Sequence, residues 1–377
     1  MSSHDVIVVG VGAMGSAACS HLARRGARVL GLERDTIPTV RGSSHGQSRM
    51  IRCAYYEHPD YVPLLLRSWE LWQELNEISG RTCLVPTGGL YAGPAGCELV
   101  EASIEAARLH GLDHERLDHA AMRERFPQFE LPEHFTGMYE PKAGFLVPEW
   151  CIEAHVDAAR RHGADVREGI EVLEWSVEHD SVVVTTAEGE FRASHLVLCA
   201  GAWMPSLAHI APRLAPTRQP LVWVRPAEPD SLACGTLPCW AVDRAEGGLH
   251  YGFPMLSGLP GPDGFKLAVH AAGPPIDPEA DRDPRSGDED DSLAFIDAHL
   301  PAARGPVEAV GICMYTNTDD EHFIIDRHPE HPQVTVAGGF SGHGFKMASV
   351  VGEIVADLAL EGRTGHPIGF LGLHRFD

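Results

Sequence analysis

Short apolar runs and amphipathic stretches alternate at the start of the chain. Residues 6–9 form a four-residue apolar run, which is typical of a buried strand. Residues 16–25 predict a helix that stops at Gly26, and residues 28–32 predict a second strand that ends at Glu33. A strand, a helix and a strand in this order predict a βαβ unit with parallel strands.

Further along the chain, helical spacing of apolar residues and short strand-like apolar runs both recur, and the strand-like runs are more numerous. Apolar residues at helical spacing predict helices over 61–75, 152–159 and 347–358. Strand-like runs cover 181–186, 195–199, 220–224, 249–253, 265–270, 309–315, 323–326 and 334–337. Four of these runs fall between about 219 and 316 without predicted helices between them, so a separate antiparallel sheet is expected there.

A glycine motif lies in the turn between the first predicted strand and helix. It reads Gly10-Val11-Gly12-Ala13-Met14-Gly15, the G-x-G-x-x-G pattern. We expect Gly10 to permit the turn, Gly12 to let a pyrophosphate approach the backbone, and Gly15 to let the helix pack closely on the strand. The helix N-terminus offers free N–H groups to phosphate, and Glu33 can accept from ribose hydroxyls. The motif therefore predicts a dinucleotide with an unphosphorylated adenosine ribose.

Two later segments suggest that the ligand is extended. The run over 195–199 ends in Ala200-Gly201-Ala202-Trp203, which suits a second close approach of backbone to the dinucleotide. Residues 338–346 are rich in glycine and lead into the last predicted helix. Two helix N-termini that tolerate anions, one near each end of the chain, fit an extended cofactor such as FAD better than a small ligand.

Composition narrows the classes of partner. The chain has 377 residues, with Lys+Arg 30 against Asp+Glu 53 and a net charge of −23. This balance argues against nucleic acid and anionic membranes, which are approached through basic patches. The acidic stretch 277–291 reads as a solvated loop and not a site. The nine cysteines form no Cys-x-x-Cys pair, so we expect no metal site and a reducing compartment.

The N-terminal residues also bear on location. Residues 1–5 lack a basic region, and the apolar run after them is too short for a signal peptide or a membrane span. A cytoplasmic protein with no membrane attachment is therefore expected.

Four motifs together resemble one known family. They are Gly10-Val11-Gly12-Ala13-Met14-Gly15, Ser44-His45-Gly46-Gln47-Ser48-Arg49-Met50-Ile51-Arg52, Cys313-Met314-Tyr315-Thr316-Asn317-Thr318 and Gly339-Phe340-Ser341-Gly342-His343-Gly344-Phe345-Lys346. Nearly end to end, the chain is similar to the flavoenzyme family of monomeric sarcosine oxidase and N-methyltryptophan oxidase. These enzymes share the D-amino-acid-oxidase-type fold.

The resemblance implies an α/β fold with a Rossmann-type FAD-binding domain and a second, substrate domain built on a largely antiparallel sheet. We assign residues 1–85, 145–215 and 320–377 to the FAD-binding domain, which is discontinuous. Residues 86–144 and 216–319 then form the substrate and catalytic domain.

The resemblance also implies covalent FAD, joined through its 8α-methyl group to the sulfur of Cys313. Attachment needs a thiolate, and a basic neighbour lowers a thiol pKa. Arg49, whose family counterpart lies against the isoalloxazine ring, is the candidate neighbour. The expected cofactor contacts are Gly10, Gly12, Met14, Gly15, Glu33, Arg34, Ser43, Ser44, Arg49, Val172, Ala200, Gly201, Trp203, Cys313, Gly342, Gly344, Phe345 and Lys346.

The same resemblance assigns residues to the substrate. Arg52 is expected to fork onto a substrate carboxylate, with Lys346 as a second cation and Tyr315 beside them. Lys266 is expected to assist the reaction with dioxygen, because a fixed positive charge stabilises negative charge that develops on O2. The expected catalytic residues are Lys266, Arg49, His45, His270 and Tyr251.

The expected activity is the oxidative demethylation of a secondary N-methyl amino acid such as sarcosine. Its partners are the amino acid and O2, its products are the demethylated amino acid, formaldehyde and H2O2, and the protein is expected to be a monomer. The segment 252–264 is longer than its counterpart in sarcosine oxidase, and such a loop beside the pocket would admit a bulkier side chain.

Other activities remain open at this point. One alternative substrate is a cyclic secondary amino acid such as pipecolate or proline, and another is a bulkier N-methyl amino acid such as N-methyltryptophan. An NAD-dependent dehydrogenase and a non-catalytic nucleotide-binding protein would also retain the first glycine motif.

Overall fold

The first of two large sheets contains the predicted βαβ unit. The computed structural model describes residues 4–211, 213–244 and 247–376. In the first sheet, β9 (Asp165–Arg167), β2 (Val29–Leu32), β1 (His4–Val9), β12 (Gly189–Leu198) and β19 (Val334–Gly338) run parallel in that order. β18 (Ile324–Arg327) pairs antiparallel with β19. The hairpin of β10 (Val172–Glu178) and β11 (Ser181–Thr186) extends the first half of β12.

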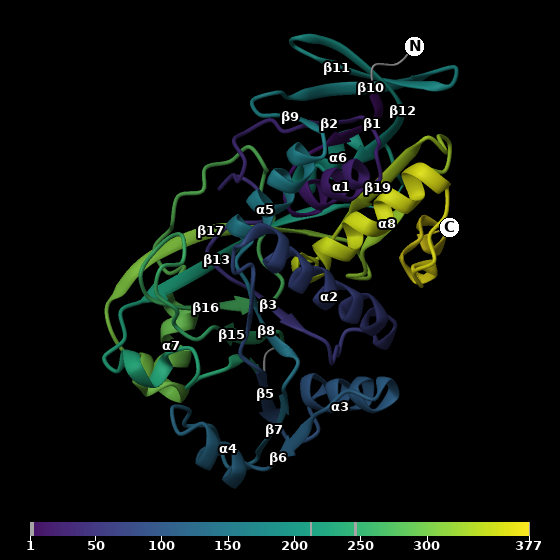
Figure 1. The fold of residues 1–377 in the computed structure, drawn as a ribbon. Helices are drawn as coiled ribbons and strands as arrows, with labels where there is room; N and C mark the ends of the chain where they lie inside the picture. Colours follow the sequence, from purple (N-terminus) through teal and green to yellow (C-terminus); the bar gives the residue numbers. More distant parts are fainter. Residues whose placement is uncertain (1–3, 212, 245–246, 377) are drawn as a thin grey trace.

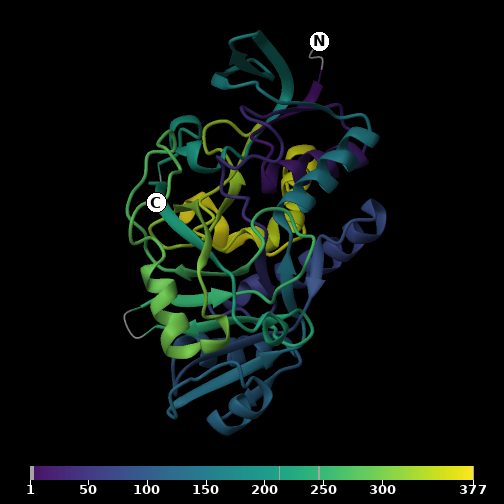
Figure 2. The same cartoon turned by 90° about the vertical axis from the view of Figure 1, so that its left-hand side faces the viewer.

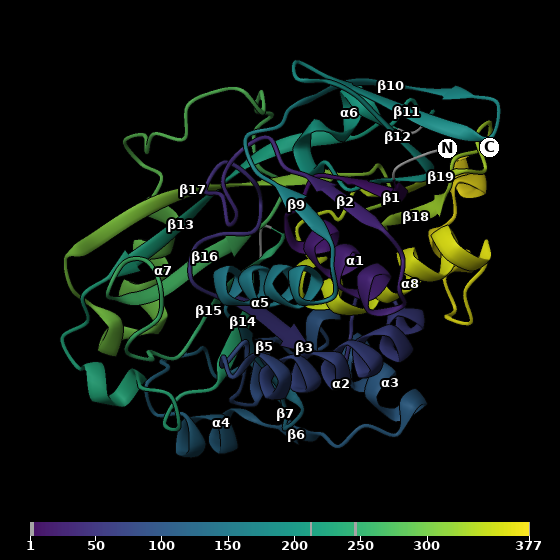
Figure 3. The ribbon, with the colours of Figure 1, turned by 45° about the horizontal axis from the view of Figure 1, so that its top comes forward.

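Helices cover one face of this sheet. α1 (Ala13–Arg24) packs against both α5 (Pro148–Arg161) and α8 (Ala348–Glu361), and α2 (Val62–Ser79) packs on α8. Figure 3 shows these helices beneath β1 and β2, with α2 in the outer layer. The opposite face packs against the β10–β11 hairpin and the short α6 (Met204–Leu207). Because both faces are covered, β2 and the last four residues of β1 are apolar and buried.

The second large sheet lies at the other end of the molecule (Figures 1 and 2). Its strand order is β17-β13-β16-β15-β14-β5-β7-β6, and every neighbouring pair is antiparallel except β14 and β5. The strands are β5 (Gly89–Pro94), β6 (Glu115–Leu117), β7 (Phe135–Glu140), β13 (Ala215–Val224), β14 (Cys239–Asp243), β15 (Leu249–Gly252), β16 (Phe265–His270) and β17 (Val307–Asn317). The helices packed on this sheet are α3 (Glu98–His110), α4 (His119–Arg125) and α7 (Asp290–His299).

A small third sheet connects the two halves. It has the order β3-β8-β4, formed by β3 (Arg49–Arg52), β8 (Ala143–Leu146) and β4 (Leu84–Pro86). β3 carries Arg49 at its start and Arg52 at its end, so this sheet fixes two of the predicted site residues.

The predicted fold class is confirmed: a parallel sheet with a βαβ unit stands beside a largely antiparallel sheet. The predicted strands and helices lie within a few residues of their observed positions, while α3, α4 and α7 were not predicted. The last predicted helix begins at Ala348 after a 3-10 turn, Phe345–Met347, rather than directly from the glycine segment. The domain boundaries stay a prediction.

No helix in the part of the chain that the structure describes is long and apolar enough to cross a membrane. Residues 1–3, which belong to the N-terminal segment expected to carry no targeting signal, lie outside the described residues.

Candidate active site

A cavity of about 330 Å³ runs along the carboxyl ends of β1, β2 and β12. The β1–α1 turn, the segment 36–44 and the C-terminal glycine segment close it. This is the edge of a parallel sheet at which α/β proteins bind ligands. The walls include most of the predicted cofactor residues, namely Gly10, Gly12, Met14, Glu33, Arg34, Ser43, Ser44, Arg49, Val172, Ala200, Gly201, Trp203, Gly342, Gly344 and Phe345.

The three motif glycines meet different steric demands. Gly10 has φ +83°, and a Cβ there would lie 2.6 Å from the carbonyl oxygen of Cys199. A Cβ at Gly15 would lie 1.8 Å from the carbonyl oxygen of Gly10. A Cβ at Gly12, in contrast, would meet no described atom within 4 Å. The fold itself thus requires glycine at positions 10 and 15, whereas glycine at 12 leaves space open in a wall of the cavity.

Glu33 is buried at the end of β2 and also lines the cavity. Its Oε2 accepts a hydrogen bond from the Val11 N–H at 2.8 Å, and its Oε1 accepts from the Asp35 N–H at 3.1 Å. Burial raises the pKa of this carboxyl group. Glu33 therefore fixes the glycine turn in addition to facing the site predicted for ribose.

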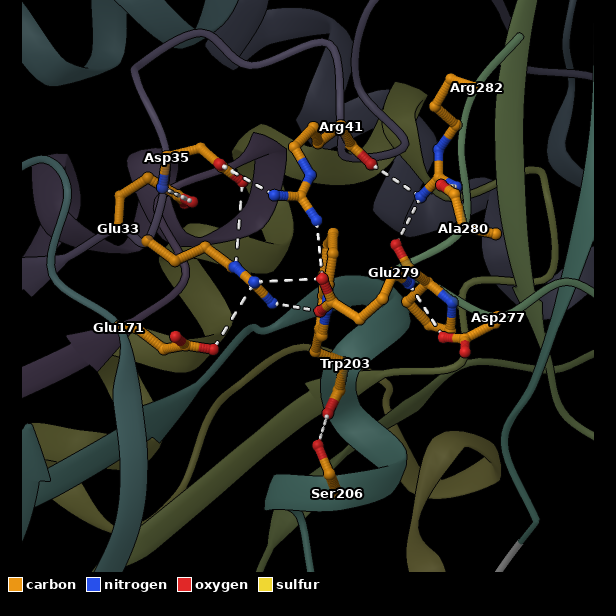
Figure 4. A network of polar contacts seen from close by, with 12 residues as sticks. Glu33, Asp35, Arg41, Glu171, Trp203, Ser206, Asp277, Glu279, Ala280 and Arg282 are labelled. Carbon is orange, nitrogen blue, oxygen red and sulfur yellow. Dashed lines mark hydrogen bonds and ion pairs between the residues drawn. The ribbon is translucent and has the colours of Figure 1, made fainter.

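The rim of this cavity holds a network that the sequence did not predict (Figure 4). Glu279 accepts from Nη1 of Arg34 at 2.7 Å, from Nη2 of Arg41 at 2.7 Å and from Nε1 of Trp203 at 2.5 Å. The hydrogen bonds from Trp203 and Arg34 lower the pKa of Glu279 to about 2. Residues 277–289 form a largely exposed loop, as expected, and Glu279 connects this loop to Arg34 and Trp203 in the cavity wall.

A second, smaller cavity of about 80 Å³ adjoins the first, and Arg49, Tyr315, Gly342 and Phe345 line both. The walls of the second cavity also include Arg52, Glu57, Tyr251, His270, Cys313 and Lys346. The predicted substrate residues therefore meet in one place, although they lie on β3, β15, β16, β17 and the C-terminal segment.

Cys313 and Arg49 lie at the junction of the two cavities. Arg49 Nη2 is 3.3 Å from the Sγ of Cys313 and also donates to the Ser43 carbonyl at 3.1 Å. Burial alone would raise the pKa of the thiol, but the Arg49 guanidinium and then His45 outweigh it and lower the pKa of Cys313 to about 6. The thiol is therefore largely ionised near neutral pH. His45 lines neither cavity, and its Nε2 is buried without a hydrogen-bond partner among the described residues.

Two buried cations and one mostly buried carboxylate line the second cavity. Arg52 is 6% exposed and donates to Oε1 of Glu57 at 2.5 Å. Lys346, also 6% exposed, donates to the His343 carbonyl at 2.8 Å. Burial would raise the pKa of Glu57, but Arg52 leads the charges that lower it to about 2. Burial, reinforced by Arg52, lowers the pKa of Lys346 to about 7.

Glu57 is a site residue that the sequence analysis missed. Its carboxylate pairs with the cation that was predicted to bind a substrate carboxylate. In the sequence, Glu57 stands out only as a carboxylate five residues after Arg52. This spacing does not by itself predict an ion pair.

Polar rings complete the second cavity. His270 Nδ1 and the Tyr315 hydroxyl are 3.0 Å apart. Burial lowers the pKa of His270 to about 4, so the imidazole is neutral at physiological pH. Tyr251 lies on β15 opposite Ala268 of β16, two residues from His270.

Lys266 lines neither of these cavities but a third one of about 350 Å³. It is 2% exposed, and its Nζ donates to the Gly46 carbonyl at 2.6 Å, to the Ser48 carbonyl at 2.8 Å and to the Ser48 hydroxyl at 3.2 Å. Residues 253–257, 259, 263 and 264 line this third cavity. None of the residues of the long segment 252–264 lines the second cavity, so the structure does not show this segment enlarging that space.

The joined first and second cavities fit a flavin dinucleotide. Gly12 leaves space for a ligand beside a helix N-terminus, and Glu33 provides a carboxylate at the end of β2. Arg49 and the thiol of Cys313 lie where the long cavity meets the small one. Gly15, in contrast, lies behind the wall, so its predicted cofactor role is indirect, through packing of the turn.

Comparisons with known proteins agree with this arrangement. The model of the DAO family, FAD dependent oxidoreductase, matches residues 5–358. Monomeric sarcosine oxidase of Streptomyces avermitilis is 43% identical, covering 99% of this chain and 98% of its own. N-methyl-L-tryptophan oxidase of Citrobacter koseri is 33% identical, covering 94% of each chain.

A solved structure is also similar over the whole chain. NikD, an unusual amino acid oxidase essential for nikkomycin biosynthesis, superimposes with a TM-score of 0.86 at 26% identity, covering 99% of this chain and 98% of NikD. The family match and the full-length relatives show that this chain belongs to the DAO family of FAD-dependent oxidoreductases.

Proposed function

We propose that this protein is an oxidase of small secondary N-methyl amino acids, with sarcosine as the representative substrate. In the balanced reaction, the N-methyl amino acid, O2 and water give the demethylated amino acid, formaldehyde and H2O2. The observation that carries the proposal is the pair of buried cations, Arg52 and Lys346, in a small cavity that adjoins the FAD cavity.

Arg52 and Lys346 bind the substrate carboxylate in this proposal. A guanidinium presents two parallel N–H donors to a carboxylate, and an ammonium adds a point charge. Glu57 is the present acceptor of Arg52, so the substrate competes with an internal carboxylate for this cation. A site that binds its substrate through two cations favours amino acids, which carry a carboxylate, over simple amines, which do not.

The size of the second cavity favours a small substrate. Its volume of about 80 Å³ is well below the roughly 300–1,000 Å³ of sites for drug-sized ligands. An N-methyl group and a short backbone fit this space, whereas an indole side chain requires the walls to move. Pipecolate and proline are intermediate in bulk, and the experiment below distinguishes them.

Bound FAD supplies the redox chemistry, accepting a hydride equivalent from the substrate and passing two electrons to O2. The residues of the chain orient the substrate and control its charge. His270 is neutral and Tyr315 is hydrogen-bonded to it, so neither adds positive charge beside the reacting amine. The amine must itself be neutral, because a protonated nitrogen has no lone pair to assist the loss of hydride.

Two further parts of the proposal concern the cofactor and dioxygen. Cys313 would hold the flavin as a thioether at its 8α carbon. The thiol would lose its proton and the 8α-methyl group one hydrogen, and the two electrons released would pass through the flavin to O2 as H2O2. The low pKa of the thiol and the contact of Arg49 with its sulfur support this linkage. Lys266 provides the positive charge for the reaction with O2. The protein acts as a monomer in the cytoplasm.

Product analysis tests the reaction. We expect H2O2 and formaldehyde in equal amounts from sarcosine, with lower kcat/KM for pipecolate and N-methyltryptophan. Arg52→Gln keeps the FAD spectrum but raises the KM for sarcosine. Peroxide from pipecolate without formaldehyde from sarcosine would contradict the proposed substrate class.

Acid precipitation tests the cofactor linkage. We expect the yellow colour to stay with the precipitated protein, and to be released into the supernatant by Cys313→Ser. Colour released from the unaltered protein would contradict the thioether but not the proposed substrate.

A further inference from the structure

The backbone of residues 46–48 lies between two charged side chains that come from different parts of the fold. On one side, the N–H groups of Gly46 and Gln47 donate to Oε1 of Glu149 at 2.7 and 3.2 Å. On the other side, the carbonyls of Gly46 and Ser48 accept from Lys266. Glu149 lies in the first turn of α5, and Lys266 lies on β16. One short segment therefore connects an acid and a base.

The conformation of this segment creates the connection. Gly46 has φ +90° and Gln47 has φ +75°, a conformation that a residue with a side chain rarely adopts. The consecutive N–H groups of Gly46 and Gln47 donate to the same oxygen of Glu149, so this turn presents a small anion site. The Gln47 side chain is held at both ends, because its Oε1 accepts from Trp223 Nε1 at 2.8 Å and its Nε2 donates to the Pro262 carbonyl at 3.0 Å.

The charge of Glu149 is only partly balanced by these contacts. Its Oε2 is buried and has no hydrogen-bond partner among the residues that the structure describes. A buried carboxylate oxygen without a donor is costly unless positive charges lie close. Lys266 and Arg49 are the cations on which the Glu149 charge acts, and the Cys313 thiolate faces the same region.

We propose that Glu149 is a positioning residue: it shapes segment 46–48 so that the carbonyls of this segment hold Lys266, and its negative charge keeps the Lys266 amine protonated. Protonation gives Lys266 three N–H donors, which match its three oxygen acceptors at Gly46 and Ser48. The consequence for catalysis rests on the proposed role of Lys266 toward dioxygen.

Electrostatic effects at Lys266 agree with this role. Burial and the nearby Arg49 guanidinium lower the pKa of Lys266 well below its usual range, while Glu149 and then Cys313 act in the opposite direction. Removing the Glu149 charge leaves the cation of Arg49 less opposed. Lys266 then loses its proton at a lower pH.

The composition of the chain allows a direct measurement on the holoenzyme. The sequence contains three lysines, Lys142, Lys266 and Lys346. Protein labelled with [13Cε]lysine therefore gives three side-chain signals, which Lys266→Met and Lys346→Met assign. The exposed Lys142 serves as an internal reference.

We expect Glu149→Gln to lower the Lys266 titration midpoint by about one pH unit or more, because one opposite charge nearby shifts a titration by this amount. Glutamine retains a carbonyl acceptor for the two N–H groups, so a role in shaping the segment alone predicts no shift. Glu153→Gln is the matched control: Glu153 lies one turn further along α5 and pairs with Arg81, so its replacement should leave the Lys266 signal unchanged.

If Glu149→Gln does not fold, Glu149→Asp provides the same test, because it withdraws the carboxylate and should lower the midpoint by a smaller amount. A midpoint that stays at its original pH in the folded variant, or that rises, overturns the proposal. An equal shift in Glu153→Gln overturns it as well, because the effect would then not be specific to Glu149.

Stopped-flow measurements separate this inference from the proposed function. At a pH above both midpoints, Glu149→Gln should slow the reaction of reduced enzyme with O2 about tenfold, because one pH unit changes the protonated fraction tenfold. Flavin reduction by sarcosine should stay within about twofold. If Lys266→Met reacts with O2 at the original rate, the proposed role of Lys266 is wrong, whereas the titration still decides the role of Glu149.

Discussion

The two adjoining cavities are lined by different kinds of residue. The long cavity, which we propose as the FAD cavity, is lined by glycine turns and strand ends together with apolar side chains, and exposed ion pairs lie beside it. The small cavity is formed by side chains, among which Arg52, Glu57 and Lys346 are charged groups with little exposure. In the first surface, Gly10 and Gly15 are required by the backbone conformation of one turn, whereas the second surface depends on the mutual arrangement of charged side chains.

This difference determines how each cavity responds to change. The glycine turns of the first surface tolerate little alteration at the positions where chain segments touch, and the ion pairs beside it are exposed, so the loss of one of their charges costs little stability. A buried charged surface depends on mutual compensation, so removal of one member leaves another charge unbalanced. The predictions that follow test this contrast.

The largest effect is expected at the glycine turn. Gly15→Ala introduces a Cβ 1.8 Å from a backbone oxygen, and we expect it to lower the free energy of unfolding by about 3 kcal/mol or more, at the upper end of overpacking costs. Gly12→Ala meets no described atom within 4 Å. We expect it to change that free energy by less than about 1 kcal/mol while abolishing FAD incorporation.

Urea unfolding of the apoproteins and the FAD content of the purified proteins check this pair. Gly12→Ala that unfolds as easily as Gly15→Ala would show that both glycines serve the fold, and the proposed space for pyrophosphate would then lose its support.

The next effect is expected at the buried ion pair. Arg52→Gln leaves Glu57 without its partner and should lower the free energy of unfolding by about 3 kcal/mol. The double variant Arg52→Gln, Glu57→Gln removes both charges and should regain most of this loss, yet its KM for sarcosine should stay raised. Urea unfolding and steady-state kinetics measure the two effects separately.

In the unaltered protein, the pKa of Glu57 is lowered from its ordinary value of 4.5 to about 2. The stabilisation from this group is therefore complete above pH 4.5 and lost as the pH falls toward 2. A double variant as unstable as Arg52→Gln would argue against mutual compensation in this cavity.

The same contrast explains how much the sequence could predict. The βαβ unit, Gly10, Gly12 and Glu33 lie within one continuous segment, where spacing and periodicity determine local structure. Motif resemblance extended the prediction to Arg49, Arg52, Cys313 and Lys346, which the structure brings to adjoining walls. Resemblance could not show that Lys266 lines a separate cavity, because a residue's role in a family does not determine which cavity its side chain faces.

Glu57, Glu149 and Glu279 escaped prediction for a shared physical reason. Glu149 and Glu279 pair with distant segments, and Glu57 pairs with the strand that precedes it. None of these contacts follows a helical or strand periodicity that the sequence would reveal. Glu279 is 245 residues from Arg34, and Glu149 is 103 residues from Gly46. In an acidic chain, such residues cannot be distinguished by sequence from those that only solvate the surface.

A third, smaller effect is expected in the pH dependence of carboxylate binding. The pKa of Lys346 is lowered to about 7, so its cationic form is lost as the pH rises above that value. The inhibition constant of a simple carboxylate without an amine, such as propionate, should therefore be constant below pH 7 and rise about tenfold per pH unit above it.

Lys346→Met should bind propionate more weakly and without this pH dependence. The thiol of Cys313, with a pKa of about 6, does not titrate in the holoenzyme because it is part of the proposed thioether. The remaining groups do not titrate in this range, because the pKa of Glu57 is lowered to about 2, that of His343 to about 3 and that of His270 to about 4. An unaltered pH profile in Lys346→Met would assign the dependence to a different group.

The smallest effect on stability is expected at the rim of the FAD cavity. The Glu279 side chain is 51% exposed, and exposed ion pairs typically contribute less than about 1 kcal/mol. Glu279→Gln should therefore leave the free energy of unfolding nearly unchanged in urea.

The hydrogen bonds of Glu279 nevertheless join the loop after β16 to Arg34, Arg41 and Trp203 beside the cavity. We expect FAD to dissociate several-fold faster from Glu279→Gln in a Cys313→Ser background, where no thioether can retain it. This difference should shrink in high salt, because screening weakens exposed ion pairs. Equal dissociation rates at low salt would show that the rim, unlike the buried cations, contributes nothing to the ligand it surrounds.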